Sequence, residues 1–135
     1  MSMPKVLVKD VMKTNVITIK PHASLKEAMQ LMKRHGLKSL VVEKCSASDA
    51  YGIVTNSQVL KAILVEEGDI ELLNVFDVYN KPAFSVSAEI DVKYAAKMML
   101  ELNIKRVIVS DNNELKGVLS VTDLSDYLLA MVEEA

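Results

Sequence analysis

The chain has 135 residues, half of them hydrophobic, and a formal net charge of −2 at pH 7. This length suits one domain or two very small ones, and the near-neutral charge does not indicate nucleic acid or an acidic membrane surface as a partner. There is no Trp and there are only two Phe, so we expect an aliphatic core in which the eight Met serve as adaptable filler.

The chain has one cysteine, Cys45, which excludes an internal disulfide and a cysteine-based metal cluster. No apolar run approaches the ~20 residues that cross a bilayer, and the first residues lack a signal-peptide pattern. These features predict a cytoplasmic protein with no membrane partner. The two histidines, His22 and His35, lie at opposite ends of one predicted helix, so no metal site is expected.

The first half of the chain predicts the order strand, helix, strand, strand, helix. A short strand at residues 16–19 precedes Ser24, which can cap a helix with apolar residues at helical spacing. Gly36 can end that helix in a left-handed conformation. Two apolar runs typical of buried strands follow at residues 40–42 and 51–55.

Helical spacing returns over residues 57–65, and the acidic stretch 66–74 is predicted to be a solvated linker. The whole pattern then begins again. The offset is 67 residues for three pairs: Asp10 and Asp77, Leu25 and Val92, and Leu40 and Val107. It is 65 residues between Gly52 and Gly117, because the loop between the two apolar runs is two residues shorter in the second half.

A repeat of this length indicates copies of one unit that cannot bury its apolar face alone. We therefore expect one module with a first repeat at residues 8–65, a linker at 66–74 and a second repeat at 75–133. The predicted fold class is α/β, with small α+β-like sheets that carry their helices on one face. The tandem β-α-β-β-α repeats would pack with pseudo-two-fold symmetry.

The most informative stretch is Gly-Val-Leu-Ser-Val-Thr-Asp at residues 117–123, an apolar strand that ends on two hydroxyls and a carboxylate. Its earlier copy at residues 52–58 has Gln58 in place of Asp123. A carboxylate at the start of a helix is a good acceptor for the two vicinal hydroxyls of a ribose, and the helix N-terminus offers N–H groups to a phosphate. The same residues also form a good capping sequence, so Asp123 could simply begin a helix.

The tandem repeat, the short aliphatic strands and residues 117–123 resemble the CBS domain pair, or Bateman module, over nearly the whole chain. The resemblance implies a regulatory module that binds AMP, ADP, ATP or S-adenosylmethionine and signals to a partner protein. It implies no obligatory cofactor, and a homodimer formed through the helices. The sequence holds no catalytic motif, so an enzyme is not expected. The alternative is a ligand-free dimerisation or scaffold module.

The resemblance also implies site residues. Asp123 would hold the ribose, with Thr122 and Ser120 as hydroxyl contacts. The adenine would lie between two groups of residues: Pro82, Ala83 and Phe84 on one side, and Ile104 with the backbone of Lys105 on the other. Lys38 and Ser39 would approach the phosphates, although the simpler reading of Lys38 is a side chain that faces solvent. A weaker second site would comprise Arg106, Thr55, Ser57 and Gln58, and Arg106 could instead be a solvated or ion-paired residue.

Overall fold

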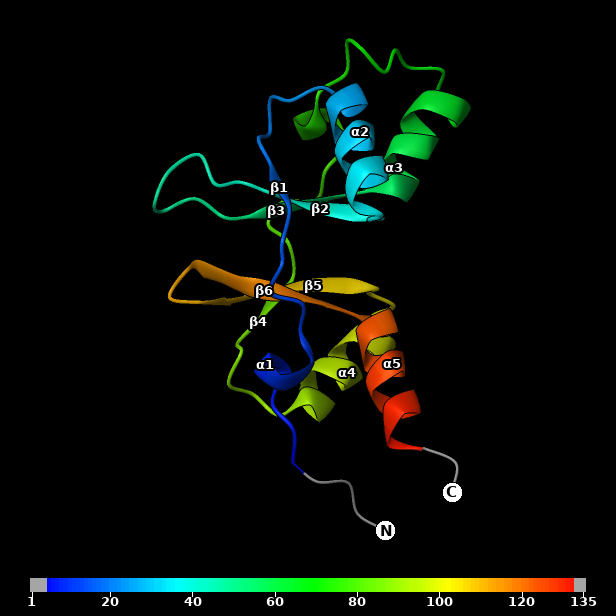
Figure 1. The fold of residues 1–135 in the computed structure, drawn as a ribbon. Coiled ribbons are helices and arrows are strands. Elements are labelled where there is room, and N and C mark those ends of the chain that lie inside the picture. Colours follow the sequence, from blue (N-terminus) through cyan, green and yellow to red (C-terminus); the bar gives the residue numbers. More distant parts are fainter. Residues whose placement is uncertain (1–4, 133–135) are drawn as a thin grey trace. The chain divides into compact units, whose positions relative to one another are not determined.

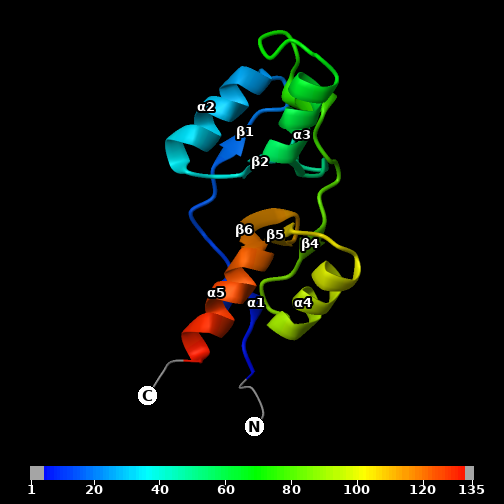
Figure 2. The ribbon, with the colours of Figure 1, turned by 90° about the vertical axis from the view of Figure 1, so that its right-hand side faces the viewer.

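The structure, a computed structural model, describes residues 5–132, which form two compact units (Figures 1 and 2). The first unit consists of residues 17–83. The second unit combines residues 5–16 with residues 84–132. The units therefore do not follow the sequence repeats, because the opening segment of each repeat packs with the other repeat.

The first unit is a three-stranded sheet in the order β1-β2-β3 with its helices on one face (Figure 1). The short strand β1 (Thr18–Ile19) pairs parallel with β2 (Ser39–Val42), which pairs antiparallel with β3 (Gly52–Thr55). A parallel pair needs a long crossover, and α2 (Leu25–His35) supplies it. The helix α3 (Asn56–Leu60) follows β3 directly.

The sequence signals at both ends of α2 are confirmed. The hydroxyl of Ser24 accepts a hydrogen bond of 3.1 Å from the Glu27 N–H. Gly36 ends the helix in the left-handed region, at φ 64°. Between these ends Leu25, Ala28 and Met32 are buried, so the apolar face identified from spacing is the face that packs on the core.

The predicted helix at residues 57–65 lies in the right place, but it is not α-helical throughout. After Leu60 the chain continues as a π-helix over Lys61–Val65, in which the Glu66 N–H bonds the Lys61 carbonyl at 3.0 Å. The wider turn takes up an additional residue while Val59 and Ala62 both stay buried. Apolar spacing over nine residues does not distinguish these two hydrogen-bond patterns.

The second unit repeats this architecture in a sheet of order β4-β5-β6 (Figure 2). The strands β5 (Arg106–Asp111) and β6 (Glu114–Ser120) form a hairpin closed by Asn112 and Asn113. Both turn residues have positive φ, 53° and 59°, as a tight two-residue hairpin requires. The remaining elements are α1 (Val8–Val11), β4 (Ser85–Val86), α4 (Val92–Glu101) and α5 (Val121–Met131).

Each unit has an aliphatic core that contains one residue from the other repeat. Val75, in a short 3-10 helix (Val75–Asp77), is fully buried among Leu25, Leu40 and Val54 in the first unit. Val8, 67 residues earlier, is fully buried in the second unit; its core neighbours there are Val86, Ala88, Ala95, Met99, Val107, Val109 and Leu119. The predicted fold class, two small α/β sheets with helices on one face, is confirmed.

Residues 66–74 follow the surface of the first unit along α2. The N–H groups of Lys26 and Leu25 donate to the carbonyls of Ile70 and Leu73 at 3.0 and 2.9 Å, and the Lys26 ammonium pairs with Glu71 at 2.9 Å. The acidic side chains of this stretch are exposed, as expected, but its backbone is hydrogen-bonded to the start of α2 and forms part of the first unit.

Candidate functional site at Asp123

Asp123 lies in the first turn of α5 as a buried carboxylate, with 8% of the side chain exposed. One carboxylate oxygen, Oδ2, accepts a hydrogen bond of 2.9 Å from the Ser120 N–H. In return the Asp123 N–H donates to the Ser120 hydroxyl at 3.0 Å. These two bonds are a complete capping box. The capping role that the sequence left open is thus present, and it occupies only one of the two carboxylate oxygens.

The other oxygen, Oδ1, faces Lys13, which sequence reasoning missed. The Lys13 ammonium lies 3.8 Å from Oδ1, and 71% of its side chain is exposed. Lys13 is 110 residues from Asp123 in the sequence, and reaches it because residues 5–16 belong to the second unit. The repeat offset gave no signal for this contact, since it relates equivalent positions and does not say which copies pack together.

The predicted site residues of the second unit lie around the start of α5, and several use their backbone there. The Lys105 carbonyl accepts from the Val121 N–H at 2.9 Å, and Arg106 stands opposite Ser120 in the β5–β6 ladder. Ile104 packs partly buried against the core. Thr122 is exposed on the first turn of α5, and Phe84 is 56% exposed. The described contacts join Ser120, Asp123, Lys105 and Arg106 to one strand-to-helix junction.

The other predicted residues of the Asp123 site belong to the first unit. The Ala83 N–H donates to the Tyr51 carbonyl at 2.9 Å, and exposed Pro82 precedes it. The Lys38 carbonyl accepts from the Asn56 N–H at 2.8 Å, while its side chain is exposed. Ser39 begins β2 opposite Thr55. Their roles toward a ligand at Asp123 stay predictions.

Residues 52–58, the earlier copy of the motif, form the same cap in the first unit without a charged side chain. The Gln58 side-chain oxygen accepts from the Thr55 N–H at 2.8 Å, and the Gln58 N–H donates to the Thr55 hydroxyl at 3.3 Å. Ser57 is exposed on the first turn of α3. Arg106, predicted for this weaker site, lies in the second unit. The local cap geometry is therefore common to both copies, and the carboxylate is what distinguishes them.

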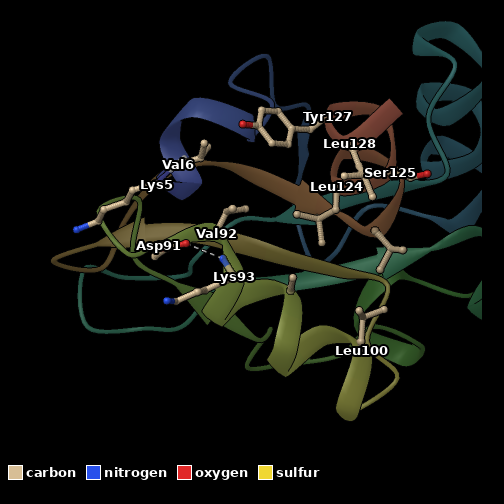
Figure 3. Close-up of a pocket in the computed structure, with 12 residues that line it drawn as sticks. Lys5, Val6, Asp91, Val92, Lys93, Leu100, Leu124, Ser125, Tyr127 and Leu128 are labelled. Carbon is tan, nitrogen blue, oxygen red and sulfur yellow. Dashed lines mark hydrogen bonds between the residues drawn. The ribbon is translucent and has the colours of Figure 1, made fainter. Parts of the chain in front are cut away.

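A second candidate is an apolar groove of about 690 Å³ on the helical side of the second unit (Figure 3). Val92 and Leu100 from α4 line it together with Leu124 and Leu128 from α5. Its polar rim includes Asp91, whose carboxylate caps α4 by accepting from the Lys93 N–H at 2.9 Å. Because its lining is mainly apolar, the groove is suited to packing against another apolar surface and not to catalysis.

Within residues 5–132, no group of three or more His, Cys, Asp or Glu side chains is arranged to hold a metal ion. Within the same residues no helix has both the length and the apolar character to cross a membrane.

Comparison with known proteins gives a consistent result. The family model described as CBS domain matches twice, at residues 8–65 and 75–130. An inosine-5′-monophosphate dehydrogenase of Korarchaeum cryptofilum is 34% identical over 82% of this chain, which corresponds to 22% of the enzyme. A hexameric CBS-CP12 protein from bloom-forming cyanobacteria is 30% identical, with a TM-score of 0.85 over 90% of this chain and 67% of that one.

A CBS domain pair solved with 5′-methylthioadenosine and S-adenosyl-L-methionine shares the fold. Its TM-score is 0.82 at 22% identity, over 95% of this chain and 99% of that one. Both repeats found in the sequence are matched by the same family model, and both units have the corresponding fold. The chain therefore belongs to the CBS-domain family and carries a tandem pair of CBS domains.

Proposed function

We propose that this CBS pair is a regulatory, non-catalytic module that binds an adenine-containing ligand and passes the signal to a partner protein. The observation that carries the proposal is Asp123: a buried carboxylate at a helix N-terminus with one oxygen, Oδ1, outside the capping box. A carboxylate oxygen can accept from the hydroxyls of a ribose, and the first turn of α5 can receive a phosphate. The related CBS pair with bound adenosine derivatives supports this ligand class.

Binding regulates only if the ligand has different affinity for two states of the protein. The Asp123 site lies at the junction of β6 and α5, and the opening segment of the chain contacts it through Lys13. We propose that a ligand held there alters the position of this segment, which the partner protein detects.

The test is thermal denaturation with millimolar AMP, ATP and S-adenosylmethionine, on the wild type and on Asp123→Asn. The asparagine retains an oxygen acceptor for the Ser120 N–H, so the cap survives while the charge is lost. A ligand at about 100 times its dissociation constant adds ~2.7 kcal/mol to the free energy of unfolding.

We expect this stabilisation in the wild type and its loss in Asp123→Asn. Asp126→Asn, an exposed position on the same helix, is the matched control and should behave as the wild type. If no adenine ligand stabilises the wild type, the proposal fails; if Asp123→Asn responds like the control, the ligand binds elsewhere.

A second function, oligomerisation, is favoured by the apolar groove of the second unit. We propose that a second copy of the chain covers it, because α5 supplies both a wall of the groove and protruding apolar side chains. Leu128 lines the groove at 51% exposure, and Leu129 beside it is 65% exposed. In a symmetric pair, the exposed leucines of α5 from each copy can therefore pack into the groove of the other copy. The hexameric relative shows that a CBS protein can assemble.

Light scattering after size exclusion tests this proposal with Leu128→Glu. We expect the wild type to be at least dimeric and Leu128→Glu to be monomeric. Leu72→Glu, at a 78% exposed leucine of the first unit, controls for the loss of surface apolarity and should keep the wild-type mass. A monomeric wild type, or dissociation by Leu72→Glu alone, contradicts the assignment.

A further inference from the structure

The position of Lys13 beside Asp123 is fixed by the backbone. Lys13 forms an antiparallel bridge with Val118, and both of its hydrogen bonds are 2.9 Å long. The bridge requires glycine at the preceding strand position, because a Cβ on Gly117 would lie 2.5 Å from the Lys13 carbonyl oxygen. The strand that carries the site motif therefore also anchors the lysine next to it.

The side chains of this pair differ in exposure. The Asp123 carboxylate is 8% exposed, whereas the Lys13 side chain is 71% exposed. At 3.8 Å the ammonium forms an ion pair with Oδ1 but lies beyond ordinary hydrogen-bond length. A flexible four-carbon stem lets the ammonium move, so it can turn toward an incoming anion without disturbing the buried carboxylate.

The first unit gives an internal comparison. There Asn80 bridges Ile53 in the same way, and Gly52 stands at the strand position equivalent to Gly117. Asn80 is thus the counterpart of Lys13, as Gln58 is of Asp123. Both charges are replaced by amides in the first unit, which indicates that the lysine and the carboxylate serve one purpose.

We propose that Lys13 determines the specificity of the Asp123 site and selects adenosine phosphates over neutral or cationic adenosine derivatives. This inference rests on the proposed function. A ribose that donates to Oδ1 competes with the ammonium for the carboxylate. A nucleoside gives the displaced ammonium no new partner, whereas a nucleotide provides a phosphate near the ribose. The sulfonium of S-adenosylmethionine would instead place a positive charge near the ammonium.

The test is calorimetric titration with adenosine, AMP and S-adenosylmethionine, on the wild type, Lys13→Met and Lys13→Arg. A hydrogen bond to a charged group contributes more than a neutral one, so the wild type should bind AMP at least about tenfold more tightly than adenosine. This preference should fall to about twofold or less in Lys13→Met, remain in Lys13→Arg, and weaken with added salt. Lys97→Met, at an exposed lysine of α4, should keep the wild-type preference.

The outcomes separate the two proposals. If adenosine and AMP bind the wild type equally, or if Lys13→Met weakens both by the same factor, Lys13 is not a specificity residue but the nucleotide site stands. Tighter binding of S-adenosylmethionine than of AMP also overturns the inference. If none of the three ligands binds the wild type, the proposed function fails and the inference fails with it.

Discussion

Gly117 and Gly52 are strand residues that the opening segments pass at a distance too short for a Cβ. A Cβ on Gly117 would lie 2.5 Å from a backbone oxygen, that of Lys13, and 2.9 Å from the Met12 sulfur. At Gly52 the shortest approach, 2.7 Å, is to the Tyr79 ring, and the Asn80 carbonyl oxygen is at 3.0 Å. The Tyr79 ring can move aside more easily than the hydrogen-bonded backbone of Lys13, so a Cβ should be tolerated better at Gly52 than at Gly117.

We therefore expect Gly117→Ala to lower the free energy of unfolding by about 1–3 kcal/mol, the range for overpacking, and Gly52→Ala to lower it less. Urea denaturation followed by circular dichroism measures both. Equal losses, or a larger loss at Gly52, would show that the opening segment moves freely over Gly117.

The carboxylate of Asp111 links the end of β5 to the segment after β4. It accepts from the Ser87 hydroxyl at 2.6 Å and from the Ala88 N–H at 3.2 Å. These bonds, led by the Ser87 hydroxyl and aided by the charge of Lys116, hold the pKa of Asp111 below its usual value. Since the folded-state pKa is the lower one, ionisation favours the folded state.

This stabilisation is fully present above the pKa of the unfolded chain, about 3.9, and disappears as the pH falls through the folded-state pKa. Asp111→Asn should therefore be less stable than the wild type at pH 7, and the two should converge as the pH drops below about 4. Thermal denaturation from pH 7 to pH 3 checks this. A stability difference that is constant with pH would assign the effect to packing instead of charge.

At the scale of elements, the two helices that follow the Gly-led strands begin with the same reciprocal cap. In α5 the cap pairs Ser120 with a carboxylate, and in α3 it pairs Thr55 with an amide. A carboxylate in the first turn gains from the helix dipole, and the hydroxyl bond is shorter in α5, 3.0 Å against 3.3 Å. The cap of α5 should be the stronger one.

Ser120→Ala should lower the free energy of unfolding by about 1 kcal/mol, the usual value for a lost N-cap hydroxyl, and Thr55→Ala by less. Guanidinium denaturation of the ligand-free protein gives both values. If Ser120→Ala left stability unchanged, the Ser120 hydroxyl, which accepts from the Asp123 N–H, would not contribute measurably to the start of α5.

At the scale of the molecule, the notable feature is the exchange of opening segments between repeats. Val8 and Val75 each fill the core of the unit built mainly from the other repeat. Because a domain of about 60 residues is only marginally stable, the loss of one fully buried core residue and its segment is a severe defect. A fragment that is meant to fold by itself should therefore end at the unit boundaries and not at the repeat boundaries.

A fragment of residues 17–83 should unfold cooperatively on heating, whereas a fragment of residues 8–74, cut after the predicted linker, should show a broader transition or none. Circular dichroism at 222 nm, with matched concentrations, makes the comparison. Equal cooperativity would mean that the exchanged segment around Val75 contributes little to folding of the first unit.

The sequence by itself determined the repeat, the order of the elements, the helix ends at Ser24 and Gly36, and the aliphatic character of the cores. These features rest on local backbone preferences and on side-chain spacing along single segments, which a sequence displays directly. It also singled out Asp123 as the distinctive carboxylate, while leaving capping and ligand binding open.

Only the tertiary structure decided which segments pack together. Nothing in the local pattern of residues 5–16 says that they complete the second unit, because their burial depends on partners far away in the chain. The contact of Lys13 with Asp123 follows from that packing and from the space above Gly117. The π-helical turn after Leu60 was likewise visible only in the structure, since apolar spacing over so short a segment fits an α-helix equally well.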